Sequence, residues 1–102
     1  MNPISVRYSV VDNKITEYCT VVVFTYEINY PALYNIGLDV CVEQFSNSEE
    51  GLFVREHSTP GSVKTNCYHN HERYTQVYCV IAELTSIRLT EFLLRFGNKT
   101  NT

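Results

Sequence analysis

The segment "NCYHNHE", residues 66–72, carries three side chains that could hold a metal ion. Cys67, His69 and His71 occupy alternate positions, and alternate residues of an extended strand point to the same side. A thiolate with two imidazoles is a ligand set that zinc accepts, but a structural zinc site needs a fourth ligand, and no Cys-x-x-Cys pair stands nearby. The other interpretation is a polar hairpin tip with solvated histidines. A small zinc-binding module is therefore our alternative hypothesis for function.

The residue types needed for hydrolysis are present only as separate parts. The sequence has no Gly-x-Ser-x-Gly motif and no glycine-rich phosphate-binding loop. Cys19 and Cys79 both stand among apolar neighbours, where a thiol usually behaves as an inert small hydrophobic group. Glu17 and Glu83 each lie in a mostly apolar strand pattern, where exposure at a strand end or pairing with an arginine accounts for a carboxylate. We therefore predict no catalytic residues and no enzymatic activity.

Tyrosines are the better candidates for a binding surface. The chain has eight of them, and tyrosine is enriched at protein interfaces because it combines a large apolar contact area with a hydroxyl group. Tyr18 and Tyr78 are each followed by a cysteine, whereas Tyr26 and Tyr34 lie before and within a short predicted helix. We expect these four tyrosines to form a protein-binding surface. The alternative is a second packing layer, in which they lie inward beneath a helix.

The first elements of the chain form a predicted β-hairpin over residues 4–24, with Asp12-Asn13 as its two-residue turn. The facing pairs in this register are Val10 with Ile15, Val6 with Cys19, and Ile4 with Val21. Because side chains of a strand alternate between two faces, one face is apolar apart from Glu17. Its apolar members are Ile4, Val6, Tyr8, Val10, Ile15, Cys19, Val21 and Val23. We expect this to be the inner face of the protein.

The middle of the chain is harder to assign. A short helix from Pro31 to Ile36 is expected, because proline is tolerated in a first helical turn and Gly37 can end a helix. Apolar and polar residues then alternate over 38–45, which favours a strand, although the spacing of apolar residues over 33–40 would also suit a longer helix. A polar loop over 46–51, a short strand over 52–57 and a turn over 58–62 follow.

The last part of the chain repeats the pattern of the first. Residues 62–84 read as strand, turn and strand, and residues 85–97 place apolar residues at helical spacing and stop at Gly97. Tyr18-Cys19 matches Tyr78-Cys79, and Gly37 matches Gly97, at one constant offset. This predicts a duplicated strand-strand-helix unit, since one such unit buries too little apolar surface to be stable alone. The predicted parts are a first unit at 4–37, a connector at 38–61, a second unit at 62–97 and a flexible tail at 98–102.

Length and composition limit the class of protein. A chain of 102 residues forms one domain. Its net charge is −3 and it has no run of Lys or Arg, which disfavours a nucleic-acid partner because binding to the phosphate backbone needs clustered cations. There is no signal-peptide pattern and no apolar run approaching the roughly 20 residues of a membrane span. We therefore expect a soluble intracellular protein that does not enter a membrane.

The stretch "VVVFTYEINYPALYNIG" at residues 21–37, the tyrosine-rich β composition, the length and the four cysteines carry a resemblance. The chain as a whole resembles the small orphan proteins of filamentous viruses that infect hyperthermophilic archaea, such as the Acidianus filamentous viruses. The resemblance implies a viral protein in the cytoplasm of its host, where a disulfide among Cys19, Cys41, Cys67 and Cys79 would be less surprising than in other cells. The sequence leaves all three pairings open. The resemblance implies no reaction, because it brings no active site with it.

Two similar units docked about a pseudo-twofold axis would leave a groove between them. Open sheets also leave edge strands that can accept an extended peptide. We therefore expect one compact α+β domain that acts without a cofactor as a protein- or peptide-interaction module. The expected partner is a viral or host protein or peptide, or a second copy of the chain.

Overall fold

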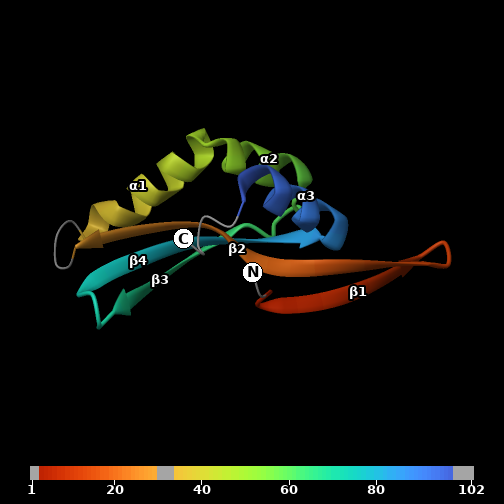
Figure 1. Cartoon of the computed structure of the whole chain (residues 1–102), viewed down its shortest axis with the longest axis horizontal. Coiled ribbons are helices and arrows are strands. Elements are labelled where there is room, and N and C mark those ends of the chain that lie inside the picture. Colours follow the sequence, from red (N-terminus) through yellow and green to blue (C-terminus); the bar gives the residue numbers. More distant parts are fainter. Residues whose placement is uncertain (1–2, 30–33, 98–102) are drawn as a thin grey trace.

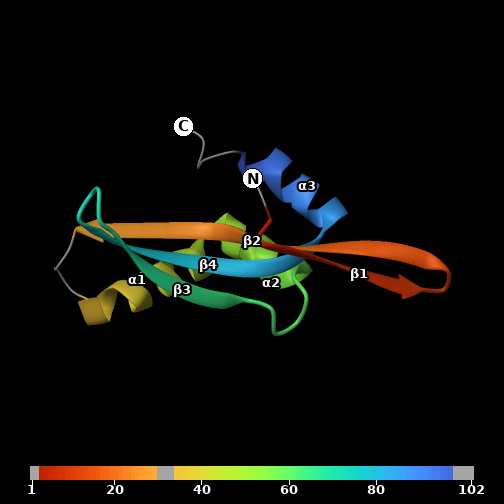
Figure 2. The same ribbon diagram turned by 90° about the horizontal axis from the view of Figure 1, so that it is seen from below.

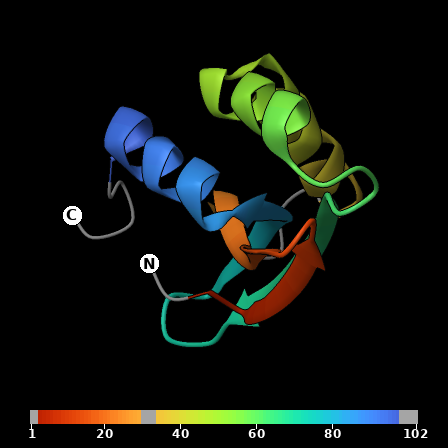
Figure 3. The same cartoon turned by 90° about the vertical axis from the view of Figure 1, so that its right-hand side faces the viewer.

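The computed structural model describes residues 3–29 and 34–97 (Figure 1). Its elements are β1 (Ser5–Val11), β2 (Lys14–Asn29), α1 (Tyr34–Asn47), α2 (Glu49–His57), β3 (Lys64–Asn70), β4 (Thr75–Thr85) and α3 (Ser86–Phe96). The strands form one antiparallel sheet in the order β1-β2-β4-β3. All three helices lie against the same side of this sheet, which we call the helix side, and the opposite side we call the open side (Figure 2 and Figure 3). The predicted α+β class is confirmed.

The first predicted hairpin is confirmed in register as well as in kind. Asp12 and Asn13 both have positive φ angles, 52° and 63°, as a two-residue type I′ turn requires. Val10 pairs with Ile15 and Val6 with Cys19, whereas Ile4 donates its main-chain N–H to the carbonyl of Thr20 at 2.7 Å. The second hairpin, β3 and β4, is also present.

A β-bulge keeps both halves of β2 apolar on the helix side. The pairing with β4 runs regularly from Tyr18 to Val22 and resumes at Phe24, so Val23 is an extra residue. Before the bulge, alternate residues from Cys19 onward face the helices. After the bulge the parity changes, because one inserted residue shifts the alternation by one position. The β2 residues that pack in or against the core are Cys19, Val21, Val23, Phe24, Tyr26 and Ile28.

The strand predicted over residues 38–45 is wrong, because this segment is the body of α1. The alternation of Leu38 and Val42 with polar residues suggested a strand, but both side chains are exposed. The buried positions are Gly37, Cys41 and Phe45, and a spacing of four places them on one face of a helix. Burial against the sheet therefore follows the helical period in this segment.

Gly37 was expected to end a helix, but it lies inside α1 instead. Its role is close packing, because a Cβ atom at this position would lie 2.5 Å from the ring of Tyr78. The proposed helix start at Pro31 lies outside the described residues. The short strand predicted over 52–57 is also wrong, since this segment belongs to α2. Ser48 caps the start of that helix, because its Oγ accepts a hydrogen bond from the N–H of Gly51 at 3.0 Å.

The C-terminal helix matches its prediction. Thr85 caps the start of α3, because its Oγ1 accepts a hydrogen bond from the N–H of Arg88 at 3.2 Å. Gly97 ends it with a positive φ of 71°, and its N–H donates to the carbonyl of Leu93 at 2.8 Å. Phe92 of this helix is buried in the core beside Phe53 of α2, with ring centroids 5.8 Å apart.

The structure does not show the predicted duplication, although strand-strand-helix occurs twice along the chain. The residues that were matched lie in different settings. Cys19 belongs to the core on the helix side, where Tyr78, not Cys79, is its counterpart. Gly37 lies within a helix and Gly97 at the end of one. The sequence match aligns Cys19 with Cys79, which lies one residue from its structural counterpart Tyr78. Because side chains alternate along a strand, the matched side chains therefore lie on opposite faces of the sheet.

Candidate functional site

One end of the molecule consists of a hairpin that extends beyond the rest of the sheet. Pairing between β2 and β4 begins only at Tyr18, which lies opposite Thr85, whereas β1 continues to pair with β2 as far as Val11 and Lys14. We call residues 4–17 the arm; residues 8–17 extend beyond β4, and residues 4–7 form its base beside the part of β2 that pairs with β4. Figure 1 shows the arm running out past the helices at the right of the view. The arm contributes to the long dimension of a molecule that measures 52 × 26 × 23 Å.

The helix side of the arm is apolar and uncovered. We define the arm face as the side chains of Ile4, Val6, Tyr8, Val10 and Ile15, which are between 42% and 72% exposed. The same side of β2 is buried further along, where Val21 is fully covered. The apolar pattern therefore continues past the point where the helices stop covering it.

Glu17 is the carboxylate on this side of the arm, and it lies opposite Tyr8 in the strand pairing. A hydrogen bond to this carboxylate, which only the protonated phenol can donate, raises the pKa of Tyr8. Repulsion between a phenolate and the carboxylate raises this pKa further. The thiol of Cys19 also donates to Glu17 Oε1, at 3.7 Å. Burial, followed by the nearby carboxylate, raises the pKa of Cys19. The phenol of Tyr8 and the thiol of Cys19 thus both contact the carboxylate of Glu17, which borders the arm face.

The base of the arm is fixed to the sheet from the open side. Arg7 of β1 reaches across β2 and donates two hydrogen bonds of 2.7 Å to the carboxylate of Glu83 on β4. The guanidinium also lies over the ring of Tyr18, 4.0 Å from its centroid. These hydrogen bonds from Arg7 lower the pKa of Glu83, whose side chain is only 12% exposed. A bidentate, partly buried pair of this kind restrains the direction in which β1 and β2 leave the sheet.

Of the four tyrosines predicted to bind a protein, the three whose side chains the structure describes do not form one surface. Tyr18 lies on the open side beneath Arg7. Tyr78 is 2% exposed and belongs to the core, while Tyr26 pairs with it across β2 and β4 and packs against the core. Tyr34 begins α1, but its side chain lies outside the described residues. Packing therefore accounts for Tyr78 and Tyr26, as the alternative interpretation anticipated.

The suggested zinc ligands lie on β3 and at its end. The rings of His69 and His71 are 4.5 Å apart between centroids, and the amide of Gln76 contacts the sulfur of Cys67. Within the described parts of the chain, no three or more His, Cys, Asp and Glu side chains are grouped so that they could hold a metal ion. All four cysteines are free thiols, and Cys67 is the exposed one among them.

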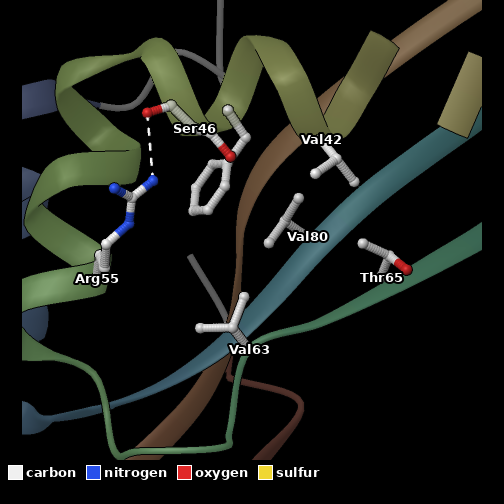
Figure 4. Close-up of a pocket in the computed structure, with 7 residues that line it drawn as sticks. Val42, Ser46, Arg55, Val63, Thr65 and Val80 are labelled. Atoms are coloured by element: carbon white, nitrogen blue, oxygen red, sulfur yellow. Dashed lines mark hydrogen bonds between the residues drawn. The ribbon is translucent and has the colours of Figure 1, made fainter. Parts of the chain in front are cut away.

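A second candidate surface is a crevice at the opposite edge of the sheet. It has a volume of about 230 Å³ and lies between helices α1 and α2 and the strands β3 and β4 (Figure 4). Its lining is mostly apolar and comprises Val42, Phe45, Ser46, Arg55, Val63, Thr65 and Val80. Arg55 borders it, where the guanidinium donates to the carbonyl of Ser46 at 3.4 Å. The crevice adjoins β3, which is an edge strand.

The residues of the arm face were recognised in the sequence as one apolar face, but they were assigned to the interior. For Tyr8, Val10 and Ile15 the missing information was the length of the partner strand, because β4 has 11 residues, β2 has 16, and their pairing ends at Tyr18. Val6 lies on the edge strand β1 and Ile4 directly before it, and the strand order was needed to show this. No helix within residues 3–29 and 34–97 is long and apolar enough to cross a membrane. Comparison with protein-family models, with curated proteins and with solved structures finds no match.

Proposed function

We propose that this chain is a protein-interaction module and that the arm face is its docking surface. The observation that carries the proposal is the row of five apolar side chains that the helices leave uncovered. Given their exposed fractions, they present on the order of 500 Å² of contiguous surface, which is comparable to the largest apolar patch of a typical monomer and often marks a binding site. Because these side chains are already partly covered, burying each of them in a partner would contribute less than burying a fully exposed one, which contributes about 1.5–3 kcal/mol.

The rest of the arm suits this role. The ion pair between Arg7 and Glu83 holds its base in place, so the arm face is presented in a defined direction and little ordering entropy is lost on binding. Glu17 lies at the border of the face and supplies a polar contact for a partner's donor. The resemblance to viral orphan proteins supports a partner that belongs to the virus or to its host.

Two neighbouring valines allow a matched test. Val10 belongs to the arm face and is 67% exposed, while Val11 points to the open side and is 62% exposed. Immobilised wild-type protein, Val10→Glu and Val11→Glu are compared for capture of proteins from a lysate of host cells. We expect Val10→Glu to lose capture, because it places a charge in the apolar contact, and Val11→Glu to retain it. Equal capture by both variants would show that the arm face is not the docking surface.

The crevice beside β3 supports a second candidate function, which is the binding of an extended peptide. A free strand edge can accept the main chain of a peptide, and an adjoining apolar pocket can accept one of its side chains. Val63 lines the crevice from the segment that precedes β3. Filling it with Val63→Trp should abolish peptide binding, as measured by fluorescence polarisation with a library of labelled peptides. Unchanged binding by this variant would exclude the crevice as the site.

A further inference from the structure

The outer edge of β1 lacks the features that usually protect an edge strand. Seven residues of β1 pair with β2 without a register shift, and the strand contains no proline and no lysine. Native proteins commonly use such residues, or a bulge, to prevent an edge from pairing with another chain. The single charged residue of β1 is Arg7, which Glu83 of the same chain binds on the open side. This edge is therefore suited to main-chain pairing.

The hairpin geometry determines which main-chain groups of β1 are available. In a two-residue hairpin the residues that flank the turn form a hydrogen-bonded pair, and every second pair is hydrogen-bonded from there on. Val11 and Lys14 flank this turn, so Val10, Tyr8 and Val6 direct their N–H and C=O groups outward. The same alternation continues through the sheet, since Glu83 uses its main-chain N–H and C=O on the side away from β2.

We propose that a second copy of this chain pairs with β1, strand against strand and antiparallel, about a twofold axis at Tyr8. In this register Tyr8 faces Tyr8 of the second copy and Val6 faces its Val10. All seven residues of β1 overlap, and the outward groups on both chains are those that must bond. The arm faces of the two copies then lie side by side in a continuous sheet.

Overlap and charge together favour this register. A shift that centred the axis on Ser9 brings no like charges together but leaves Ser5 and Val6 without a β1 partner. Arg7 lies opposite Ser9 of the second copy, whereas a shift that centred the axis on Arg7 would bring two guanidinium groups together. The other edge of the sheet, β3, is a poorer match because it carries Lys64 and His69 among polar residues. Pairing of seven residues buries less than the roughly 1,200 Å² of a standard stable interface, so the dimer should be weak and concentration-dependent. The inference goes beyond the proposed function, since it uses the main-chain edge and not the arm face.

Cysteine cross-linking tests the register. Residues of a hydrogen-bonded antiparallel pair have Cα atoms about 5.5 Å apart, within the range that a disulfide spans. Single variants Tyr8→Cys, Val10→Cys and Thr16→Cys are made in a Cys67→Ser background, because Cys67 is the exposed native thiol. Under mild oxidation we expect Tyr8→Cys to give a cross-linked dimer in at least about tenfold higher yield than the other two. A mixture of Val6→Cys and Val10→Cys should give a mixed dimer.

Sedimentation of the wild-type protein over a concentration series provides the second measurement, with a reversible monomer-dimer equilibrium as the expected result. A monomer at every concentration would overturn the inference, and so would a dimer in which Tyr8→Cys does not cross-link or Val10→Cys links to itself. The proposed function is judged separately by the capture experiment. A monomeric protein whose capture depends on Val10 would retain the docking surface and overturn the pairing of β1 with a second copy.

Discussion

The two ends of β2 carry the same kind of side chain and meet opposite surroundings. In the middle of the strand, Val21 and Val23 lie beneath the helices and are buried. In its N-terminal part, Ile15 lies on the same side of the strand and is 72% exposed. An alternating apolar pattern therefore identifies a face, but only the neighbouring elements decide whether this face becomes core or surface. The uncovered end is where we place the interaction.

The largest expected effect comes from the covered end. Leu84 pairs with Cys19 and is fully buried, so Leu84→Ala removes several methyl and methylene groups and leaves a cavity. We expect the free energy of unfolding to fall by about 2–5 kcal/mol, measured by urea denaturation. The matched change at the uncovered end, Ile15→Ala, should alter it by no more than about 0.5 kcal/mol. Similar losses for both variants would mean that the arm face is covered in solution.

Gly37→Ala should also destabilise the covered region. Alanine normally stabilises a helix interior by up to about 1 kcal/mol relative to glycine. At this position the added methyl group would meet the ring of Tyr78, and overpacking costs about 1–3 kcal/mol. Thermal unfolding shows whether Gly37→Ala lowers or raises the stability of the protein. A higher melting temperature for Gly37→Ala would show that α1 does not pack closely on Tyr78.

Replacing Arg7 should loosen the junction between the two ends. In the folded protein the hydrogen bonds from Arg7 lower the pKa of Glu83 below its usual 4.5. The pair therefore contributes stability above that pH and loses the contribution as the pH falls through the lowered pKa. We expect unfolding measurements between pH 3 and pH 7 to show a smaller loss of stability with acid for Arg7→Met than for the wild type. If stability depended on pH equally in Arg7→Met and in the wild type, the pair of Arg7 and Glu83 would not anchor the arm.

The smallest effect on stability is expected from Val10→Glu, since this side chain is 67% exposed and has little buried contact to lose. Its free energy of unfolding should stay within about 0.5 kcal/mol of the wild type. Because the same variant is expected to lose protein capture, it would separate binding from folding. A strongly destabilised Val10→Glu protein would make its loss of capture uninformative, and Tyr8→Ser would then replace it.

The sequence was sufficient to predict what is local. The turn at Asp12-Asn13, the register of the first hairpin and the end of α3 at Gly97 all follow from the conformational preferences of nearby residues. Ser48 is also a residue type that caps helices, so the start of α2 could have been predicted locally, but the polar composition of residues 46–51 predicts a loop instead. These features need no information about distant parts of the chain.

What could not be predicted depends on distant contacts. Residues 38–45 fit both periods, and burial of Cys41 and Phe45 against the sheet selects the helix. The pairing of Glu83 with an arginine was anticipated, but the identity of that arginine required the strand order, which places β2 between β1 and β4. The arm face required the difference in length between neighbouring strands. Each of these is a property of the assembled sheet.

The bulge at Val23 has a consequence for changes in chain length. Outside the valines at 21–23, loss of one residue of β2 would reverse the faces of everything on one side of the deletion and bring polar side chains into the core. At Val23 the extra residue has no partner of its own, because Val22 and Phe24 already face neighbouring residues of β4. A deletion there would leave a regular ladder with every later pair unchanged. Because residues 21–23 are all valine, loss of any one of them gives the same sequence, so this run is the place in β2 where a homologous chain could be shorter and keep the same architecture.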